Sequence, residues 1–269
     1  GPLLESYSLP GSEFSRYEAW MFGTLNVLLF SKDDGAAQEA LDCLNSIEQR
    51  LSKFLPESDV CLLNTLGASR PVTVGEELLD LIGKSQEAWE ITGGAFDPTI
   101  GSLMQAWGLV DMEARTPDSL ELSRLLECRG MDLVRIEPET RKVSFSRPGV
   151  SLDLGAIGKG YAADRIAALL PKKGIEAGAM LSGRSTVLTW GLPCEEDSWE
   201  VEICHPGNED ETLCRLSMQP GALSTSSAAE RFLRSDGKTY GHILDPRNGL
   251  PTETIEGATV WTPHAQIGR

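Results

Sequence analysis

Apolar and polar residues alternate with two different periods along this chain, and each period dominates a different part of it. In the first half, apolar side chains recur every three or four positions, which is typical of helices with one buried face. This spacing predicts helices over residues 36–54, 76–92 and 118–129. The buried stripe expected in the first helix consists of Leu41, Leu44, Ile47, Leu51 and Phe54. Gly93 and Gly94 are expected to end the second helix, because glycine readily adopts the left-handed conformation of a helix end.

Strand-like patterns lie around and after these helices. The run WMFGTLNVLLF at residues 20–30 predicts one strand with a tight point at Gly23. Residues 133–146, LVRIEPETRKVSFS, alternate on both sides of a polar turn and predict a hairpin. A further strand is expected over 175–181, and residues 185–262 show short strand patterns joined by Gly, Pro and Asn. Helices early and strands late favour an α+β fold over an alternating parallel-sheet fold.

Length and charge limit the classes of protein that remain. A chain of 269 residues can form one large or two small domains with a proper core. Its hydrophobic content of 41% and charged content of 24% are ordinary for a globular protein. The formal net charge of −16 argues against a surface that coats DNA or RNA, so no nucleic-acid partner is expected. The longest apolar run, 20–30, is too short to span a bilayer.

The six cysteines do not form a metal-binding pattern. None belongs to a C-x-x-C pair, and their spacings do not match a zinc site. Cys204 and Cys214 flank the turn-like stretch HPGNEDET and could face each other across a hairpin. One disulfide there and a set of reduced, buried thiols are therefore two open alternatives.

The stretch SLDLGAIGKGYAADRIA, from residue 151, has the character of an anion site. Lys159 stands between Gly158 and Gly160 just ahead of an expected helix that ends near Pro171. A loop of small residues before a helix exposes backbone N–H groups, and the helix dipole adds partial positive charge. Together with the lysine charge, this predicts phosphate binding. A glycine-rich turn with a solvated lysine is the alternative.

Two other stretches carry more polar residues than packing needs. GGAFDPTIG, residues 93–101, offers the flat ring of Phe96 next to Asp97, although alone it is only a helix end and an Asp-Pro turn. LSTSS, residues 223–227, places hydroxyl groups at the end of an expected strand.

GHILDPRNGLP, residues 241–251, is a second Asp-Pro turn, and it contains His242, Asp245 and Arg247. Histidine titrates near neutral pH and could act here as a general base or a phosphate donor. A lone histidine is more often structural, so the case for His242 depends on its polar neighbours.

Taken in order, these stretches resemble the ApbE family of FAD:protein FMN transferases. The resemblance rests on GGAFDPTIGSLMQAWGL, LDLGAIGKGYAADRIA, LSTSS and HILDPRNGLP, with MFGT at 21–24 and ESDVCLLN at 57–64. Each motif is weak alone, but several in register are specific. The family implies an α+β fold with mostly antiparallel sheets packed against helices. It would form a single domain over 20–262, with two closely packed subdomains as the alternative, and residues 1–19 would precede it.

The resemblance also assigns roles to particular residues. The backbone around Met21 and the segment with Phe96 and Asp97 would hold the adenine end of FAD, and the pyrophosphate would meet Lys159. The full set implied for FAD is Met21, Phe96, Asp97, Lys159, Gly160, Thr225, Ser226 and His242. His242, Asp245 and Lys159 would be catalytic, and the main-chain carbonyl of Ala156 would bind Mg²⁺. FAD is expected between the Lys159 stretch and the GGAFDPT segment.

The reaction implied is transfer of FMN from FAD to a threonine of an acceptor flavoprotein in a redox complex. Mg²⁺ would neutralise the pyrophosphate, AMP would leave, and hydrolysis of FAD to FMN and AMP is a second implied activity. Two alternatives remain: an FAD- or adenine-nucleotide-binding protein without catalysis, and an accessory protein of a redox complex without a ligand.

The family setting predicts a periplasmic or extracytoplasmic, lipid-anchored protein, with a cytoplasmic protein as the alternative. Gly1 and Pro2 resemble the remnant of a cleaved tag, so any membrane contact is expected only through an N-terminal anchor that was removed.

Three departures from the family pattern bear on activity. Arg184 and Ser185 stand where the family has Gly and Asp of a G-G-D element, and Ser227 replaces the glycine of T-S-G. Arg184 is expected either to block the flavin or to add a phosphate contact. The Asp and Thr of the family's A-D-x-x-x-T segment, both Mg²⁺ ligands, do not follow GATVWTPHAQIGR. The expectation is that this chain binds Mg²⁺ weakly and transfers little FMN, whereas a form extended through that segment is active.

Overall fold

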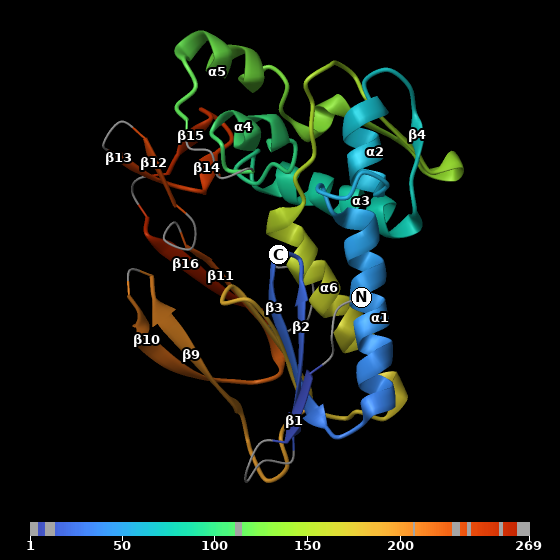
Figure 1. Cartoon of the computed structure of the whole chain (residues 1–269), viewed down its shortest axis with the longest axis vertical. Coiled ribbons are helices and arrows are strands. Elements are labelled where there is room, and N and C mark those ends of the chain that lie inside the picture. Colours follow the sequence, from blue (N-terminus) through green and yellow to red (C-terminus); the bar gives the residue numbers. More distant parts are fainter. Residues whose placement is uncertain are drawn as a thin grey trace. The chain divides into compact units, whose positions relative to one another are not determined.

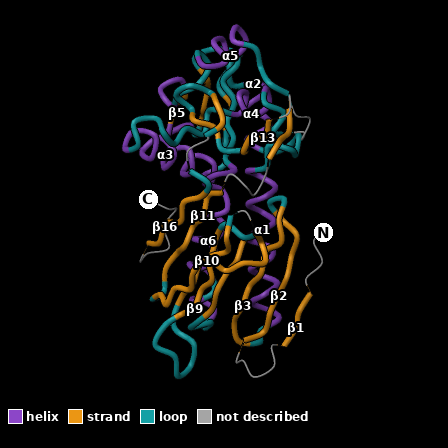
Figure 2. Tube along the Cα trace, turned by 90° about the vertical axis from the view of Figure 1, so that its left-hand side faces the viewer, coloured by secondary structure: helices purple, strands orange, loops and turns teal. Residues whose placement is uncertain are grey.

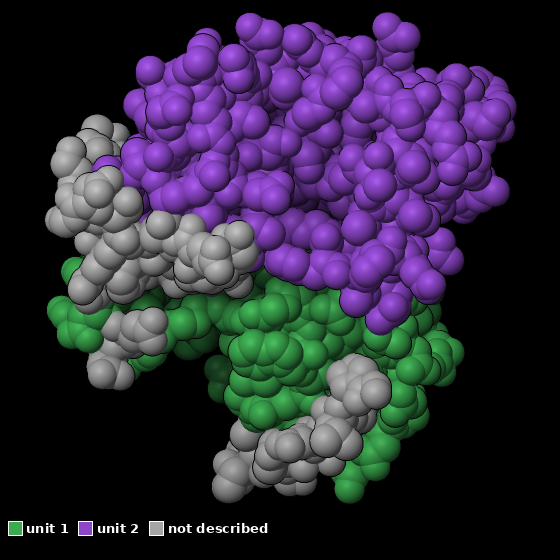
Figure 3. Space-filling view, turned by 45° about the horizontal axis from the view of Figure 1, so that its top comes forward, with its two compact units in different colours: residues 1–48, 157–227, 257–269 green, residues 49–156, 228–256 purple. Residues whose placement is uncertain are grey.

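The structure is a computed structural model that describes residues 5–8, 14–110, 115–206, 208–227, 232–235, 238–252 and 255–262. Its Cα atoms cluster into two compact units (Figure 3). Unit 1 comprises residues 1–48, 157–227 and 257–269, and unit 2 comprises 49–156 and 228–256. Each unit is therefore assembled from segments that are distant in the sequence. The number of domains predicted above stays a prediction.

Unit 1 is built on a seven-stranded sheet with the order β1-β2-β3-β7-β8-β11-β16. Its strands are β1 (Glu5–Ser8), β2 (Phe14–Met21), β3 (Thr24–Ser31), β7 (Gly178–Ser182), β8 (Thr186–Trp190), β11 (Gly221–Ser227) and β16 (Gly257–Thr262). All neighbouring pairs are antiparallel. Helices α1 (Asp34–Leu51) and α6 (Gly155–Leu169) lie on one face of this sheet (Figure 1, Figure 2). A 3₁₀ turn, η3 (Pro171–Lys173), and a hairpin of β9 (Trp199–His205) and β10 (Asn208–Met218) complete the unit.

The predicted single strand at 20–30 is wrong, because the chain turns back within it. Phe22 and Gly23 form a two-residue loop between the paired residues Met21 and Thr24. Both loop residues have positive φ, 56° and 69°, as a tight hairpin loop requires. Phenylalanine is uncommon at such a position, and its N–H is held by the Glu48 carboxylate at 2.6 Å. The tight point predicted at Gly23 is confirmed.

The core of unit 1 lies between this sheet and the two helices. Tyr17 and Phe30 stack with ring centroids 4.8 Å apart and are almost fully buried. The predicted helix at 36–54 is confirmed as α1, and four of the five residues of its expected apolar stripe are buried: Leu41, Leu44, Ile47 and Leu51. Phe54 lies beyond the end of the helix and is 65% exposed, so its assignment to the stripe is wrong.

Unit 2 combines short helices with small sheets. The helices are α2 (Asp59–Leu66), α3 (Glu76–Ile91), α4 (Gly101–Ala106) and α5 (Ser119–Leu126), with 3₁₀ turns η1 (Met131–Leu133) and η2 (Pro138–Thr140). The strands are β4 (Val72–Thr73), β5 (Val134–Glu137), β6 (Lys142–Phe145), β12 (Phe232–Ser235), β13 (Lys238–Gly241), β14 (Leu244–Asp245) and β15 (Leu250–Pro251). The helices predicted at 76–92 and 118–129 and the hairpin at 133–146 are confirmed as α3, α5 and β5–β6.

A small apolar cluster joins α4 to the turn between β14 and β15. Its buried members are Leu103, Trp107, Leu109 and Leu244. Trp107 Nε1 also donates to the carbonyl oxygen of Gly249 at 2.8 Å. A side chain at Gly249 would strain a backbone with φ of +71° and would approach Leu122 to 2.7 Å. The turn after Asp245 is therefore seated firmly on α4.

The cysteines of the β9–β10 hairpin do not face each other. Cys214 pairs with Ile203, whereas Cys204 pairs with Thr212, across an irregular register. Because adjacent residues of a strand point to opposite faces, Cys204 and Cys214 lie on opposite faces of the hairpin. Both are free thiols, and the disulfide alternative is wrong. Separately, within the described residues no helix is long and apolar enough to cross a bilayer.

Candidate active site

Lys159 lies inside helix α6 and not in a loop before it. The helix begins at Gly155, whose N–H donates to Asp153 Oδ1 at 2.9 Å. This contact starts the helix before the lysine, so the predicted loop around Gly158 and Gly160 is wrong. The N–H groups of a helix's first turn have no acceptor within the helix. Gly155 and Ala156 in that turn are exposed, but the N–H of Gly155 is already bonded to Asp153, so phosphate binding at this end of α6 stays a prediction.

Ser185 joins two residues of the set that the family resemblance implied for FAD, Lys159 and Thr225. It lies in the turn between β7 and β8 and is 8% exposed. The ammonium group of Lys159, which is partly buried, donates to Ser185 Oγ. The carbonyl oxygen of the same serine accepts the N–H of Thr225 at 2.7 Å. Lys159 on α6 and Thr225 on β11 are thus held together by one residue, and the neighbouring Arg184 is exposed.

Hydroxyl groups continue from Thr225 across the edge of the sheet. Thr225 pairs with Thr259 of β16, and their Oγ1 atoms are 3.0 Å apart. Ser226 is exposed on the other face of β11. A cavity of about 260 Å³ lies beside Thr225, Ser227 and Thr259, and Ile203, Cys204 and Leu213 also line it. The expected end-of-strand position of the hydroxyl residues is confirmed by β11.

The side chain of Met21 is buried. The residue is 1% exposed within the core, and its carbonyl oxygen accepts the Asn26 side-chain amide at 2.9 Å. The role predicted for the backbone around Met21 stays a prediction. Gly160 is a partly exposed residue of α6, one position after Lys159.

Asp97 is a buried carboxylate in unit 2, with 5% exposure. Its Oδ1 accepts the N–H and the hydroxyl of Thr99, at 2.8 and 2.5 Å. The hydroxyl oxygen of Thr99 in turn accepts the N–H of Gly130 at 2.6 Å. Burial raises the pKa of Asp97, and the hydrogen bonds from Thr99 and the charge of Arg129 offset only part of that rise. Phe96 beside it is partly exposed, and its role at the adenine stays a prediction.

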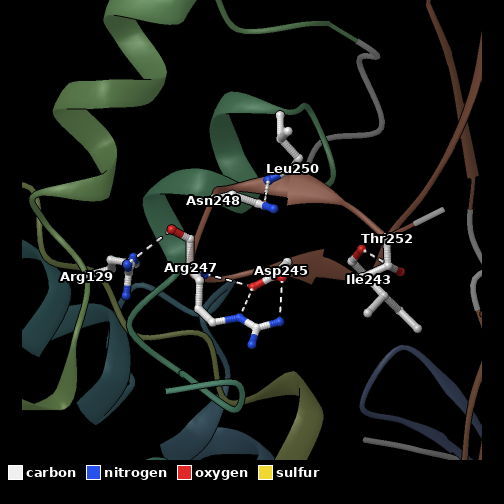
Figure 4. Close-up of polar contacts among 7 residues, drawn as sticks. All are labelled: Arg129, Ile243, Asp245, Arg247, Asn248, Leu250 and Thr252. Carbon is white, nitrogen blue, oxygen red and sulfur yellow. Dashed lines mark hydrogen bonds and ion pairs between the residues drawn. The ribbon is translucent and has the colours of Figure 1, made fainter. Parts of the chain in front are cut away.

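Asp245 is held by Arg247 in a two-point ion pair (Figure 4). The guanidinium donates to Oδ1 at 2.9 Å and to Oδ2 at 2.7 Å, and the Arg247 N–H also reaches Oδ1 at 2.9 Å. These bonds lower the pKa of Asp245, so the carboxylate is ionised and a weak proton acceptor. His242 lies just before β14 and is partly exposed.

The described residues do not form a magnesium site by themselves. Ala156 is an exposed residue in the first turn of α6, where a backbone carbonyl accepts the N–H four residues on, whereas Mg²⁺ prefers octahedral oxygen coordination with at least one carboxylate. The nearby carboxylate of Asp153 is already engaged, by Lys53 Nζ at 2.5 Å and by the N–H of Gly155. Across the described residues, no group of three or more His, Cys, Asp or Glu could hold a metal ion.

The predicted site residues fall into one set in each unit. Unit 1 contains Met21, Lys159, Gly160, Thr225 and Ser226, and unit 2 contains Phe96, Asp97, Ala156, His242 and Asp245. The structure adds residues that sequence reasoning did not assign to the site: Ser185 and Thr259 in unit 1, and Thr99 and Arg129 in unit 2. Thr99 had a local signal, because a threonine two positions after an aspartate commonly donates to it. The contact between Ser185 and Lys159 depends on the sheet and left no such signal.

These features define an α+β protein with a lysine-containing polar cluster suited to a phosphorylated ligand. The sequence matches the model of the ApbE family over residues 21–268, and the chain belongs to that family. It is 30% identical over 247 residues to an FAD:protein FMN transferase of Klebsiella pneumoniae (strain 342), covering 91% of this chain and 76% of the relative. An FAD:protein FMN transferase of Treponema pallidum (strain Nichols) is 30% identical over 276 residues, covering 94% and 75%.

Solved structures agree with this assignment. The crystal structure of an ApbE protein from Thermotoga maritima superposes with a TM-score of 0.87 at 27% identity, covering 94% of this chain and 82% of that one. The flavin transferase ApbE from Vibrio cholerae has a TM-score of 0.78 and shares the fold, at 24% identity and with coverage of 98% and 84%. The predicted family and the predicted α+β fold are confirmed.

Proposed function

We propose that this protein is an enzyme that transfers FMN from FAD to a threonine of an acceptor flavoprotein. The observation that carries the proposal is the match over most of the chain to relatives named FAD:protein FMN transferase. The cluster of Lys159, Ser185 and Thr225 supports it, because a lysine fixed by a serine next to strand-end hydroxyls suits a pyrophosphate.

The proposed reaction is a phosphoryl transfer, in which one P–O bond forms and one breaks. The acceptor hydroxyl oxygen forms a bond to the riboflavin-side phosphorus, and the bond from that phosphorus to the bridging oxygen of AMP breaks. His242 is the proposed proton acceptor, because Asp245 is ionised but its proton affinity is reduced by Arg247. Lys159 stabilises the negative charge on the phosphate oxygens, and positioning supplies most of the remaining rate. With water in place of the hydroxyl, the products are FMN and AMP.

The reaction is also proposed to require Mg²⁺. Bound to the pyrophosphate, Mg²⁺ would neutralise charge, and the carbonyl of Ala156 would be its contact with this chain. Since the described residues do not complete a metal site, titration with a chelator and re-addition of Mg²⁺ is the direct test. AMP release that survives chelation would refute the requirement.

The function is tested by incubating the protein with FAD, Mg²⁺ and a flavoprotein domain that has a reactive threonine. From a form extended through the A-D-x-x-x-T segment we expect AMP in solution and fluorescent flavin covalently attached to the acceptor, and from the chain of 269 residues we expect little of either. FMN and AMP without labelled acceptor would indicate a hydrolase. FAD retained unchanged through gel filtration would indicate a binding protein, and no retained FAD would indicate an accessory protein without a ligand.

The acceptor and the setting complete the proposal. We propose a flavoprotein of a redox complex as acceptor and an extracytoplasmic, lipid-anchored enzyme, as the family resemblance implies. Fractionation of cells that express the full-length protein tests the location. Recovery in the soluble cytoplasmic fraction would refute it.

A further inference from the structure

Arg129 connects two segments of unit 2 that carry predicted site residues. Its backbone is tied to the first of them, because the N–H of the next residue, Gly130, donates to Thr99 Oγ1 at 2.6 Å, and Thr99 binds Asp97. Gly130 has a φ of +117°, a backbone conformation that residues with a side chain rarely adopt, so the position favours glycine. The start of the Arg129 side chain is therefore fixed relative to Asp97.

The other end of the side chain reaches the turn that follows His242. A terminal guanidinium nitrogen of Arg129 donates to the carbonyl oxygen of Arg247 at 3.3 Å (Figure 4). This turn is internally rigid, since Arg247 binds Asp245 at two points and the N–H of Gly249 reaches the carbonyl of Asp245 at 2.8 Å. A contact to Arg247 therefore positions Asp245 as well.

Charge supports the same arrangement. Burial raises the pKa of Asp97 and the hydrogen bonds from Arg247 lower the pKa of Asp245, and at both carboxylates the positive charge of Arg129 acts in the lowering direction, so the guanidinium lies within electrostatic reach of both. Arg129 Nε and Asp97 Oδ2 are buried and have no hydrogen-bond partner among the described residues. A buried donor left without a partner is unfavourable for folding alone. The unpaired Nε–H of Arg129 therefore costs stability, and stability alone does not explain why the side chain lies here.

We infer that Arg129 is a positioning residue, which fixes the spacing between the Asp97 segment and the β14–β15 turn, which starts at Asp245 just after His242. An effect of Arg129 on catalysis rests on the proposed function, whereas its effect on the spacing of the two segments does not. Arg129 acts through Arg247 and Gly130 and is not assigned a contact with substrate.

The test compares Arg129→Met and Arg129→Lys with the matched control Arg135→Met, which removes an exposed arginine of β5 in the same unit. Hydrogen exchange by mass spectrometry on free protein follows the amides of residues 243–252. We expect Arg129→Met to speed exchange in this turn about tenfold, the effect of losing a hydrogen bond from a charged group. Arg129→Lys should recover most of the protection, because lysine keeps the charge and a donor. Arg135→Met should behave as wild type.

Steady-state kinetics distinguish a positioning role from a purely structural one, because a purely structural role would not lower kcat selectively. With FAD and acceptor, Arg129→Met should lower kcat about tenfold and change the KM for FAD less than twofold, and Arg129→Lys should restore kcat at least threefold. Unchanged exchange in Arg129→Met overturns the inference. So does a change in KM with kcat intact. If the Met variant does not fold, Arg129→Gln replaces it in both measurements.

The inference and the proposed function fail separately. Exchange is measured without FAD, so it judges the spacing role even if wild-type protein transfers no FMN. Failure of the wild type in the transfer assay removes the proposed function. Normal wild-type transfer together with unchanged exchange in Arg129→Met removes only the role of Arg129.

Discussion

Replacing Thr99 by valine should destabilise unit 2 although the side chain keeps its size. Thr99 is 1% exposed, and its hydroxyl serves two partners at once. It donates to Asp97 Oδ1 at 2.5 Å and accepts the N–H of Gly130 at 2.6 Å. Valine offers neither bond, so Asp97 loses a donor and the N–H of Gly130 is left buried without an acceptor.

The size of the effect follows from these two losses. A hydrogen bond to a carboxylate contributes about 1.5–3 kcal/mol, and a buried N–H left unpaired costs about 1–3 kcal/mol. Because one hydroxyl makes both bonds and the site can relax, we expect a loss of about 3 kcal/mol in the free energy of unfolding. At about 2–4 °C for each kcal/mol, Tm should fall by roughly 6–12 °C.

Urea denaturation followed by circular dichroism measures the loss, and Thr99→Ser is the matched control. Serine keeps the hydroxyl and loses only a methyl group, for which we expect a cost of about 1 kcal/mol. If Thr99→Val is as stable as wild type, the hydroxyl contributes nothing. The reasoning about Asp97 and Gly130 would then be refuted.

The remaining predictions concern the ligand and pH. Lys159→Met should weaken FAD binding about tenfold to a hundredfold, because a charged contact to the phosphate is lost, and calorimetry measures this change. Lys172→Met, which removes an exposed lysine, is the control and should bind FAD as wild type does. Equal affinities of Lys159→Met and wild type would remove Lys159 from the site. Ser185→Ala should weaken FAD binding about threefold to tenfold, since Lys159 is no longer oriented, and unchanged affinity would contradict that role. Arg247→Gln should raise the pKa of Asp245 in an NMR titration. Because the pKa of Asp245 is lowered in the folded state, its ion pair with Arg247 stabilises the fold above about pH 4 and stops doing so as the pH falls further. The difference in free energy of unfolding between wild type and Arg247→Gln should therefore shrink in acid.

Elements with a clear apolar and polar period were predictable from the sequence, and elements without one, or with an unusual turn, were not. α1 and α3 extend over several turns, so their apolar stripes repeat often enough to be recognised. α4 is only 6 residues long, and α2, although as long as α5, consists mostly of apolar residues, so no polar face marks its helical period. The β2–β3 hairpin was missed because its loop begins with Phe22, whose positive φ has no signature like that of Asn-Gly.

The sequence marked separate segments as candidates for the site, but it did not indicate the contacts that the fold makes within them. Glycines and an Asp-Pro turn marked the segments of Lys159 and Asp245 because their chemistry is local. Ser185 appeared only as a departure from the family pattern, and its bond to Lys159 exists because β7, β8 and α6 pack together. Arg129 had no local signal, since its partner Arg247 is far along the chain.

The segmented construction of unit 1 bears on how the chain folds. The central pairing of β3 with β7 brings residue 26 next to residue 182, and β16 adds to β11 only after residues 228–256 have been made. Closing so long a loop before its contacts form makes folding slow. Residues 49–156 lie inside that loop, and any structure they form early would shorten its effective length. On the ribosome the open edge of β11 must wait for the last strand, so partly made chains are the species most exposed to aggregation and most dependent on chaperones.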